Sequence, residues 1–511
     1  MQRRTGGLLL VLICLAACTS SPGVTATEAR STGTTAQSSG DTTPDTTQPG
    51  NTSPATTSPQ SPDTTEPVDS TSPDQSDGFG VGDVLFPSLG NPGIDVEHYT
   101  LRLTYDRPTN ELTGTVHLDI VMTEARNEFS LDSDGPAVSA VTIDGQSAGF
   151  SEQRPELVIT PPQQLTKGQR IAVDVSFERS PQAFTSASWG PVGWFPTPGG
   201  SFVLNEPEGA STWFPCDDHP SDQASFRFEL TVPNGVTAVA NGALLDHTST
   251  TSGDTWTWQE DRPMSTYTIQ VLTGDYELID GVGPNGLPML SAVLREDRDT
   301  MQPYVDSSAA MIGFFDDYFG PYPLDSYGVA IADSLSGVAM ETFGRPMYSR
   351  DDFSSGRLDT PQETLLSHEL AHQWFGNAVS PASWSDVWLN ESFATYGQWM
   401  WLDHIGDVPL DESANFALAT RGSGSTAYPT VEDMFGFNSY EGGAVVLQAL
   451  RKTIGDEPFF TLLRRWVSEN NGTARDTADF IALANEVAGR DLADFFDTWL
   501  FASTLPARFP A

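Results

Sequence analysis

Basic residues are scarce in this chain. Lysine and arginine together number 25, against 68 aspartates and glutamates, so the 511-residue protein carries a formal net charge of −43. Such a charge repels phosphate backbones and anionic lipid headgroups, which argues against a nucleic-acid partner and against electrostatic docking on a membrane. The length is too great for one ordinary core and predicts two or three domains.

Cysteines are equally few. Two of the three, Cys14 and Cys18, lie close to the N-terminus, and only Cys216 lies in the body of the chain. A mature chain without the leader has no second thiol, so no intramolecular disulfide can stabilise the fold. We interpret Cys216 as a buried structural thiol, because its neighbours Pro215 and Asp217 do not suggest activation.

Long apolar runs are also lacking, and the longest one near the N-terminus has the features of an export signal. Arg3 and Arg4 precede an apolar stretch at residues 8–17, which is too short to span a bilayer. It ends in Leu-Ala-Ala-Cys, which resembles the bacterial lipobox. We therefore predict a lipoprotein signal peptide at residues 1–18, with Cys18 acylated and the protein anchored on the outer face of the cell membrane. A plain secretory signal cut near the same place is the alternative.

Composition divides the rest of the chain into three parts. Residues 19–79 are rich in Ser, Thr and Pro and nearly devoid of large apolar side chains, which predicts a disordered tether. Residues 80–278 show short alternating runs separated by turn residues, which predict an antiparallel β-sandwich-like domain. From residue 279 to 511 the apolar period is helical, so the fold class is α+β, with a mainly helical second domain. Helices are expected at about residues 303–319, 361–376, 389–404, 441–454, 457–468 and 477–487.

One of these helices carries the residue types of a metal site. His368 and His372 stand four residues apart, so on a helix both imidazoles project from one face toward one point. Eighteen residues after His372, Glu391 on a second helix can reach the same metal. Two histidines and one glutamate leave one coordination position open for water, and this donor set favours one Zn²⁺ per chain over magnesium or calcium. Glu369 then remains free to take a proton from the hydrolytic water. Two satisfied histidines beside a surface glutamate are the alternative.

Several stretches, in the right order, resemble the zinc aminopeptidases of the aminopeptidase N and leukotriene hydrolase type, which are gluzincins. The resemblance covers roughly residues 93–505. The matching stretches are His-Glu-x-x-His with its Trp-Leu-Asn-Glu helix at 388–391, the segment Glu-Pro-Glu-Gly-Ala-Ser-Thr-Trp-Phe-Pro-Cys at 206–216, and Tyr-Phe-Gly-Pro-Tyr-Pro at 318–323. The resemblance implies a thermolysin-like catalytic domain at 279–511 and an aminopeptidase that hydrolyses the N-terminal peptide bond of extracellular peptides.

The same resemblance implies roles for three further residues. Tyr440, in Tyr-Glu-Gly-Gly-Ala, resembles the start of the family's Y-E-K-G-A segment, where the phenol stabilises the oxyanion. Glu341, in Gly-Val-Ala-Met-Glu-Thr, resembles the glutamate of the G-A-M-E-N strand, and Glu206 matches the glutamate of the Glu-Pro segment. Both are implied to bind the free N-terminus of the substrate. Taken alone, Tyr440 would be a half-buried loop aromatic and each glutamate a solvated surface residue.

Three positions depart from the family pattern. Val338 and Thr342 stand where the G-A-M-E-N strand has Gly and Asn, so contacts to the substrate backbone are expected to differ. Gly442 replaces the lysine of the tyrosine segment. The sequence also ends at Ala511, whereas many relatives continue into a large helical domain, and a more open cleft is the expectation.

Two other functions stay open at this point. The chain could be a non-catalytic, zinc-containing surface protein that binds peptides, which would need neither Glu369 nor Tyr440. It could instead be a zinc endopeptidase with an open cleft, or an epoxide hydrolase, although the sequence gives the epoxide reaction no positive support.

Overall fold

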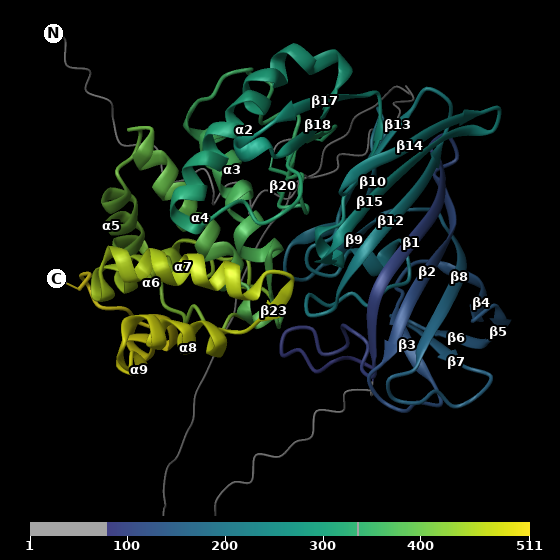
Figure 1. The fold of residues 1–511 in the computed structure, drawn as a ribbon, viewed down its shortest axis with the longest axis horizontal. Coiled ribbons are helices and arrows are strands. Elements are labelled where there is room, and N and C mark those ends of the chain that lie inside the picture. The colour runs from purple at the N-terminus through teal and green to yellow at the C-terminus, as the bar shows by residue number, and fades with distance from the viewer. Residues whose placement is uncertain (1–78, 335–336, 511) are drawn as a thin grey trace, which may run out of the picture. The chain divides into compact units, whose positions relative to one another are not determined.

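The computed structural model describes residues 79–334 and 337–510 (Figure 1). The predicted signal peptide, Cys18 and all but the last residue of the predicted tether lie outside the described residues. Among the described helices, none combines the length and apolar character that crossing a bilayer requires.

The first half of the described chain is built from three β-sheets, drawn from purple to teal in Figure 1. An eight-stranded sheet has the order β14-β15-β12-β1-β2-β8-β4-β5, a five-stranded sheet the order β13-β16-β11-β10-β9, and a small sheet the order β3-β7-β6. Alternate side chains of the long strands are buried, as the period of two predicts. The strands are β1 (Ile94–Asp106), β2 (Glu111–Met122), β3 (Phe129–Asp132), β4 (Ala137–Ile143), β5 (Gln146–Ser147), β6 (Gly149–Gln153), β7 (Glu156–Thr160), β8 (Arg170–Arg179), β9 (Ala183–Ser186), β10 (Gly190–Pro196), β11 (Ser201–Leu204), β12 (Gln223–Val232), β13 (Thr237–Ala240), β14 (Ala243–Thr250), β15 (Gly253–Ser265) and β16 (Val271–Gly274).

One pairing in this half differs from the antiparallel arrangement that the sequence predicts. Strands β1 and β12 run parallel, with Leu101 opposite Phe228, in the middle of the largest sheet. The alternation of buried and exposed residues shows which face of the sheet a side chain occupies, and it is the same in parallel and in antiparallel strands. Strand direction therefore could not be read from the period alone.

The second half combines a mixed five-stranded sheet, of order β17-β18-β19-β21-β20, with the helices of the chain. Its strands are β17 (Tyr276–Val282), β18 (Pro288–Leu294), β19 (Ala330–Ala332), β20 (Ala339–Met340) and β21 (Met347–Ser349), and β22 (Val379–Pro381) pairs separately with β23 (Thr473–Arg475). The predicted domain start at residue 279 falls inside β17. The helices are α2 (Arg298–Phe319), α3 (Thr360–Ala371), α4 (Trp388–His404), α5 (Leu410–Thr420), α6 (Glu441–Ile454), α7 (Asp456–Asn470), α8 (Thr477–Ala488) and α9 (Ala493–Phe496).

Helix α3 ends at Ala371, five residues earlier than the sequence predicts. Beyond it the backbone leaves the helical region at Phe375, and Gly376 has a φ of 119°, which a side chain would strain. A Cβ on Gly376 would also come 3.2 Å from the side chain of Asn390. The turn places the Phe375 carbonyl where it accepts a hydrogen bond from His372, so the early end of α3 helps to orient a predicted metal ligand.

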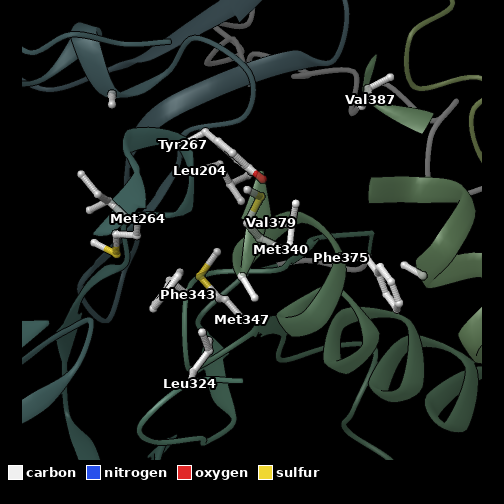
Figure 2. Close-up of a cluster of buried hydrophobic side chains, with 14 of the residues drawn as sticks. Leu204, Met264, Tyr267, Leu324, Met340, Phe343, Met347, Phe375, Val379 and Val387 are labelled. Carbon is white, nitrogen blue, oxygen red and sulfur yellow. The ribbon is translucent and has the colours of Figure 1, made fainter. Parts of the chain in front are cut away.

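The two halves share one hydrophobic core. Figure 2 shows apolar side chains of both halves gathered in one cluster, with Leu204, Met264 and Tyr267 from the β-rich half and Phe343, Met347 and Val379 from the helical half. Polar contacts cross the same junction. The Gln223 side chain donates to the Ser380 hydroxyl at 2.6 Å, and Asn241 donates to the carbonyl of Phe343 at 3.1 Å. The junction is thus closed by packing and by hydrogen bonds together.

Candidate active site

The three predicted metal ligands meet between α3 and α4. Nε2 of His368 lies 3.1 Å from Nε2 of His372, and Oε2 of Glu391 lies 3.3 Å and 3.4 Å from these two nitrogens. All three side chains are buried. The spacing of four residues on α3 and the start of α4 therefore bring two imidazoles and one carboxylate to a single point.

The donor set fits a zinc ion. Nδ1–H of His368 donates to Oε1 of Gln398 at 3.0 Å, and Nδ1–H of His372 donates to the Phe375 carbonyl at 3.1 Å. With the Nδ1 protons used in this way, each Nε2 can offer a lone pair to a metal ion beside Oε2 of Glu391. Ligand atoms about 2.1 Å from a tetrahedral zinc stand about 3.4 Å apart, close to the spacings observed. The hydrogen bonds at Nδ1 fix the tautomer that such a site needs.

Glu369 lies on α3 between the two histidines and is not required as a ligand. Its carboxylate, a carboxylate oxygen of Glu341 and a ring nitrogen of His372 all lie within 4.8 Å of one another. Burial raises the pKa of Glu369, and Glu341 and Glu391 raise it further, although His372 lowers it. A carboxylate with a raised pKa beside a metal site is suited to accept and return a proton.

Glu206 and Glu341 reach the same place from different sheets. Glu206 follows β11 and Glu341 follows β20, yet their carboxylates and that of Glu391 lie within 4.8 Å of one another. Oε1 of Glu206 and Oε1 of Glu341 are buried and have no hydrogen-bond partner among the described residues. Burial raises the pKa of both side chains, and neighbouring carboxylates add to the effect. Buried acceptors without a donor are a site for a cation.

The pKa values of His372 and Glu391 also reflect the excess of carboxylates around the metal ligands. Burial by itself lowers the pKa of His372, but Glu341 and Glu391 raise it to about 10. The pKa of Glu391 is lowered to about 2, because His372 and His368 outweigh the opposing effect of burial. The carboxylate cluster therefore favours positive charge at two places, one between the imidazoles and Glu391 and one between Glu206 and Glu341.

Tyr440 lies directly before α6 and is half-buried. Its ring stacks on the ring of His368, with centroids 5.9 Å apart and planes 10° apart. The structure thus brings Tyr440 to the metal ligands, although it belongs to a loop far away in the sequence.

Some residues of the site were not predicted. Gln398, which orients His368, lies seven residues after Glu391 on the same face of α4, and this helical spacing could have identified it. Asn377 donates to the carbonyl of Glu341 at 2.7 Å. Tyr267 donates from its hydroxyl to the Gly376 carbonyl at 3.2 Å. Asn377 and Tyr267 follow no spacing that marks them in the sequence.

The departures from the family pattern also have places in the structure. Thr342 is buried, and its hydroxyl donates to the Arg345 carbonyl at 2.6 Å and accepts from Gln270 at 2.9 Å. Val338 is partly buried. A Cβ on Gly442 would lie 3.4 Å from the guanidinium carbon of Arg421.

Cys216 is buried and free, as expected for a structural thiol. Burial and the neighbouring carboxylates, Asp218 first among them, raise the pKa of its thiol well above the usual value. Such a thiol has little thiolate and is unreactive.

Two family models match the chain in order. The Peptidase M1 N-terminal domain matches residues 95–268, and the Peptidase family M1 domain matches residues 304–499. An M1 zinc metallopeptidase from Deinococcus radiodurans, solved as a mutant bound to a Tyr-Ser-Ala substrate, is 30% identical and superposes with a TM-score of 0.76. The alignment covers 84% of this chain and 99% of that chain. This chain belongs to the M1 peptidase family. The fold class predicted from the sequence, a β-rich N-terminal half and a helical catalytic half, is confirmed.

Curated relatives of this M1 peptidase include larger proteins. Aminopeptidase M1-C of Oryza sativa subsp. japonica is 29% identical over 315 residues, which are 56% of this chain and 35% of that protein. Glutamyl aminopeptidase of Bos taurus is 27% identical over 58% of this chain and 33% of its own length. The chain thus spans about a third of the length of these relatives. Membership in a family with solved zinc metallopeptidases, together with the ligand geometry, indicates one zinc ion as the cofactor.

Proposed function

We propose that this M1 peptidase is a zinc-dependent aminopeptidase that removes the N-terminal residue from extracellular peptides. The observation that carries the proposal is the pair of buried carboxylate oxygens, Oε1 of Glu206 and Oε1 of Glu341, that lack a donor beside the metal ligands. A free α-ammonium has three N–H donors and a positive charge, and it satisfies both oxygens. A peptide with a blocked N-terminus satisfies neither.

The ammonium site determines which bond is cleaved. With the N-terminus held between Glu206 and Glu341, the first carbonyl of the peptide reaches the metal ligands, because Glu391 belongs to both groups of neighbouring atoms. Cleavage then follows the first residue. Binding energy from the charged terminus is used to orient the scissile bond.

The reaction divides between Glu369 and Tyr440. When bound by His368, His372 and Glu391, zinc supplies Lewis acidity that lowers the pKa of water to about 7 and polarises the scissile carbonyl. Glu369 takes a proton from the attacking water and passes it to the leaving amine. The phenol of Tyr440 donates a hydrogen bond to the oxyanion as negative charge develops there.

Several relatives that match the chain are named as aminopeptidases, which supports this proposal. Aminopeptidases from plants and mammals match the chain, as does Probable aminopeptidase 2 of Sulfurisphaera tokodaii, which is 25% identical over 81% of this chain and 54% of that protein. The Deinococcus enzyme, which this chain covers almost completely, was solved with a peptide that has a tyrosine at its first position.

Hydrolysis of a panel of aminoacyl arylamides by the purified protein tests the proposal. We expect turnover that stops on chelation, returns with added zinc, and falls by about 10³-fold in Glu369→Gln, since a general base contributes about 10² to 10⁴. The N-acetylated arylamides are the matched control and should not be cleaved. Cleavage of blocked peptides would instead support an open-cleft endopeptidase. A folded, zinc-loaded protein without turnover of either kind would support the non-catalytic binding function.

We further propose that the protein is exported and held at the outer face of the bacterial cell membrane by acylation of Cys18. The support is the leader sequence with its Leu-Ala-Ala-Cys end. Growth with a clickable palmitate analogue should label the wild-type protein and leave Cys18→Ala unlabelled. Release of unlabelled wild-type protein into the medium would show a plain secretory signal instead.

A further inference from the structure

The two carboxylates of the proposed ammonium site come from different halves of the chain. Glu206 follows β11 in the five-stranded sheet of the β-rich half, and Glu341 follows β20 in the mixed sheet of the catalytic half. Recognition of one ammonium requires a fixed gap between them, because a misplacement of about 1 Å can cost about 10²-fold in rate. Some contact across the junction must therefore hold the loop after β20 in register with β11.

Arg345 makes such a contact four residues after Glu341. Its side chain is almost completely buried, with 2% exposed. The guanidinium donates through Nε to the Leu290 carbonyl at 2.7 Å, through Nη1 to the Ala240 carbonyl at 2.6 Å, and through Nη2 to the Gly242 carbonyl at 3.1 Å. Ala240 ends β13 in the β-rich half and Leu290 lies in β18 of the catalytic half. One side chain thus joins both halves.

This guanidinium is an unusual buried charge. Within the described part of the chain Arg345 has no carboxylate at salt-bridge distance. Its charge is stabilised by the carbonyl dipoles, by the ring of Trp258, 5.1 Å from the guanidinium carbon, and at longer range by the charge of Glu260. Burial lowers the pKa of Arg345 to about 10, so it stays a cation at neutral pH. Burying a charge without a directly paired counter-charge is costly, and an apolar side chain would fill the same junction at lower cost. Arginine here serves a geometric purpose, because its rigid fork fixes three carbonyls at once.

A set of hydrogen bonds extends this contact to the whole loop. Gln270 donates to the Thr342 hydroxyl at 2.9 Å and to the Arg345 carbonyl at 2.7 Å, and Asn241 donates to the Phe343 carbonyl at 3.1 Å. We call Asn241, Gln270, Thr342 and Arg345 the junction clasp. Thr342, which departs from the family pattern, is one of its members.

The junction clasp is connected to Glu206 through hydrogen-bonded strands. Asn241 follows β13 and Gln270 precedes β16, and the sheet order is β13-β16-β11, with Glu206 just beyond the end of β11. The clasp therefore binds the loop of Glu341 to the sheet that carries Glu206.

We propose that Arg345 is a positioning residue that sets the gap between Glu206 and Glu341 and so determines recognition of the substrate's α-ammonium. The inference rests on the aminopeptidase function proposed above. Without the guanidinium, the loop after β20 loses its register with β11 while the metal ligands on α3 and α4 remain in place. A variant without the guanidinium therefore binds ligands with a free amine more weakly, whereas its binding of ligands that lack the amine is unchanged.

The test compares two competitive inhibitors that differ only in the amine. They are the amino alcohol of the residue that is cleaved best in the arylamide panel and its des-amino analogue, which for leucine are L-leucinol and 4-methylpentan-1-ol. In the wild type the amine should strengthen inhibition strongly. In Arg345→Met this preference should fall by about tenfold or more, with the inhibition constant of the des-amino alcohol changed by less than about threefold and zinc still at one per chain. Arg345→Lys should recover part of the preference, because a lysine can reach only some of the carbonyls.

Arg179→Met provides the matched control. Arg179 is a partly buried arginine of the β-rich half that also donates to a carbonyl, that of Gly135 at 2.9 Å, and its loss should leave the preference intact. If Arg345→Met does not fold, Arg345→Lys and Thr342→Val carry the test. An undiminished preference in folded clasp variants, with normal wild-type turnover, overturns the positioning role and leaves the aminopeptidase function standing. A wild type that cleaves no arylamide and shows no preference for the amine overturns both.

Discussion

Tyr440 stacks on the ring of His368, and its phenol is the proposed donor to the oxyanion. Tyr440→Phe keeps the ring and removes the donor, so we expect kcat for an aminoacyl arylamide to fall by about 10² to 10³ with KM changed by less than about threefold. Steady-state kinetics at matched zinc content measure this effect. Tyr428→Phe is the control, since Tyr428 is 69% exposed. An unchanged kcat in Tyr440→Phe would remove Tyr440 from the chemistry.

Gln398 acts on the metal through His368, since its Oε1 accepts the Nδ1 proton at 3.0 Å. Gln398→Ala should weaken zinc binding by about 10- to 100-fold, because the imidazole loses the bond that fixes its tautomer and orientation. Competition with a chelator of known affinity measures the change. Gln153→Ala, at an exposed position, should leave zinc affinity unchanged. Equal affinities of the Gln398 variant and the wild type would show that α3 orients His368 without this hydrogen bond.

The residues of the site differed in how well the sequence predicted them. The spacing of four residues places His368 and His372 on one face of a helix, so helix geometry alone predicted this pair, whereas Glu391 lies on a second helix and could only be expected to reach the same point. Glu206 and Glu341 depended on a family resemblance, because a lone glutamate looks like a surface residue. Arg345 could not have been predicted, since its partners are backbone carbonyls of distant strands and leave no pattern in the sequence.

At the scale of elements, α6 approaches α4 closely enough to require a glycine. A Cβ on Gly443 would lie 1.7 Å from Oγ of Ser392, the hydroxyl that donates to the Ser439 carbonyl at 2.5 Å. Gly443→Ala should therefore force the helices apart and lower the free energy of unfolding by about 1 to 3 kcal/mol, as overpacked cores do. Because Ser439 precedes Tyr440, kcat should fall as well.

Denaturant unfolding of Gly443→Ala and Gly422→Ala gives a direct comparison. Gly422 has no atom within 4 Å of the position where its Cβ would stand, so alanine fits there without displacing anything. Similar stability of both variants would show that α4 and α6 can separate without loss.

The ends of a helix were predicted correctly where a local sequence signal marks them. Helix α6 spans Glu441–Ile454, the expected range, because Gly455 with its positive φ ends a strongly amphipathic segment. Helix α5 was not expected, since Leu410, Ala414 and Ala417 are its only buried residues and give a weak apolar stripe. The early end of α3 comes with a hydrogen bond from His372 to the Phe375 carbonyl, and no local sequence pattern marks this contact.

For the whole molecule, the acidic composition extends into the interior as well as over the surface. Asp222, which is half-buried, is an example outside the metal site. Burial raises its pKa to about 8, and Asp95 adds to the effect, although the Val96 N–H donates to Oδ2 at 3.1 Å. Asp217, whose own pKa is raised by burial and by Asp222, lies nearby. Such groups keep a proton in the folded state that they lose in the unfolded chain.

The sign of the resulting pH dependence follows from the shift. Asp222 ionises near pH 3.8 when unfolded and near pH 8 when folded, so between these values the folded state holds more protons. Its contribution to stability is complete below pH 3.8 and is lost as pH rises toward 8. Asp222→Asn cannot ionise and keeps an oxygen that can accept from Val96. The decrease in the free energy of unfolding from pH 5 to pH 9 should therefore be smaller in this variant, by up to about 4 kcal/mol.

Urea unfolding at both pH values, with zinc in saturating excess, measures this difference directly. Metal binding is itself pH-dependent, but it affects wild type and variant alike and cancels in the comparison. Glu111→Gln, which removes an exposed carboxylate, should follow the wild-type pH dependence. A variant that loses as much stability as the wild type between pH 5 and 9 would mean that Asp222 is ionised in the folded protein. Donors other than the Val96 N–H would then have to stabilise the Asp222 carboxylate against its burial and against Asp95.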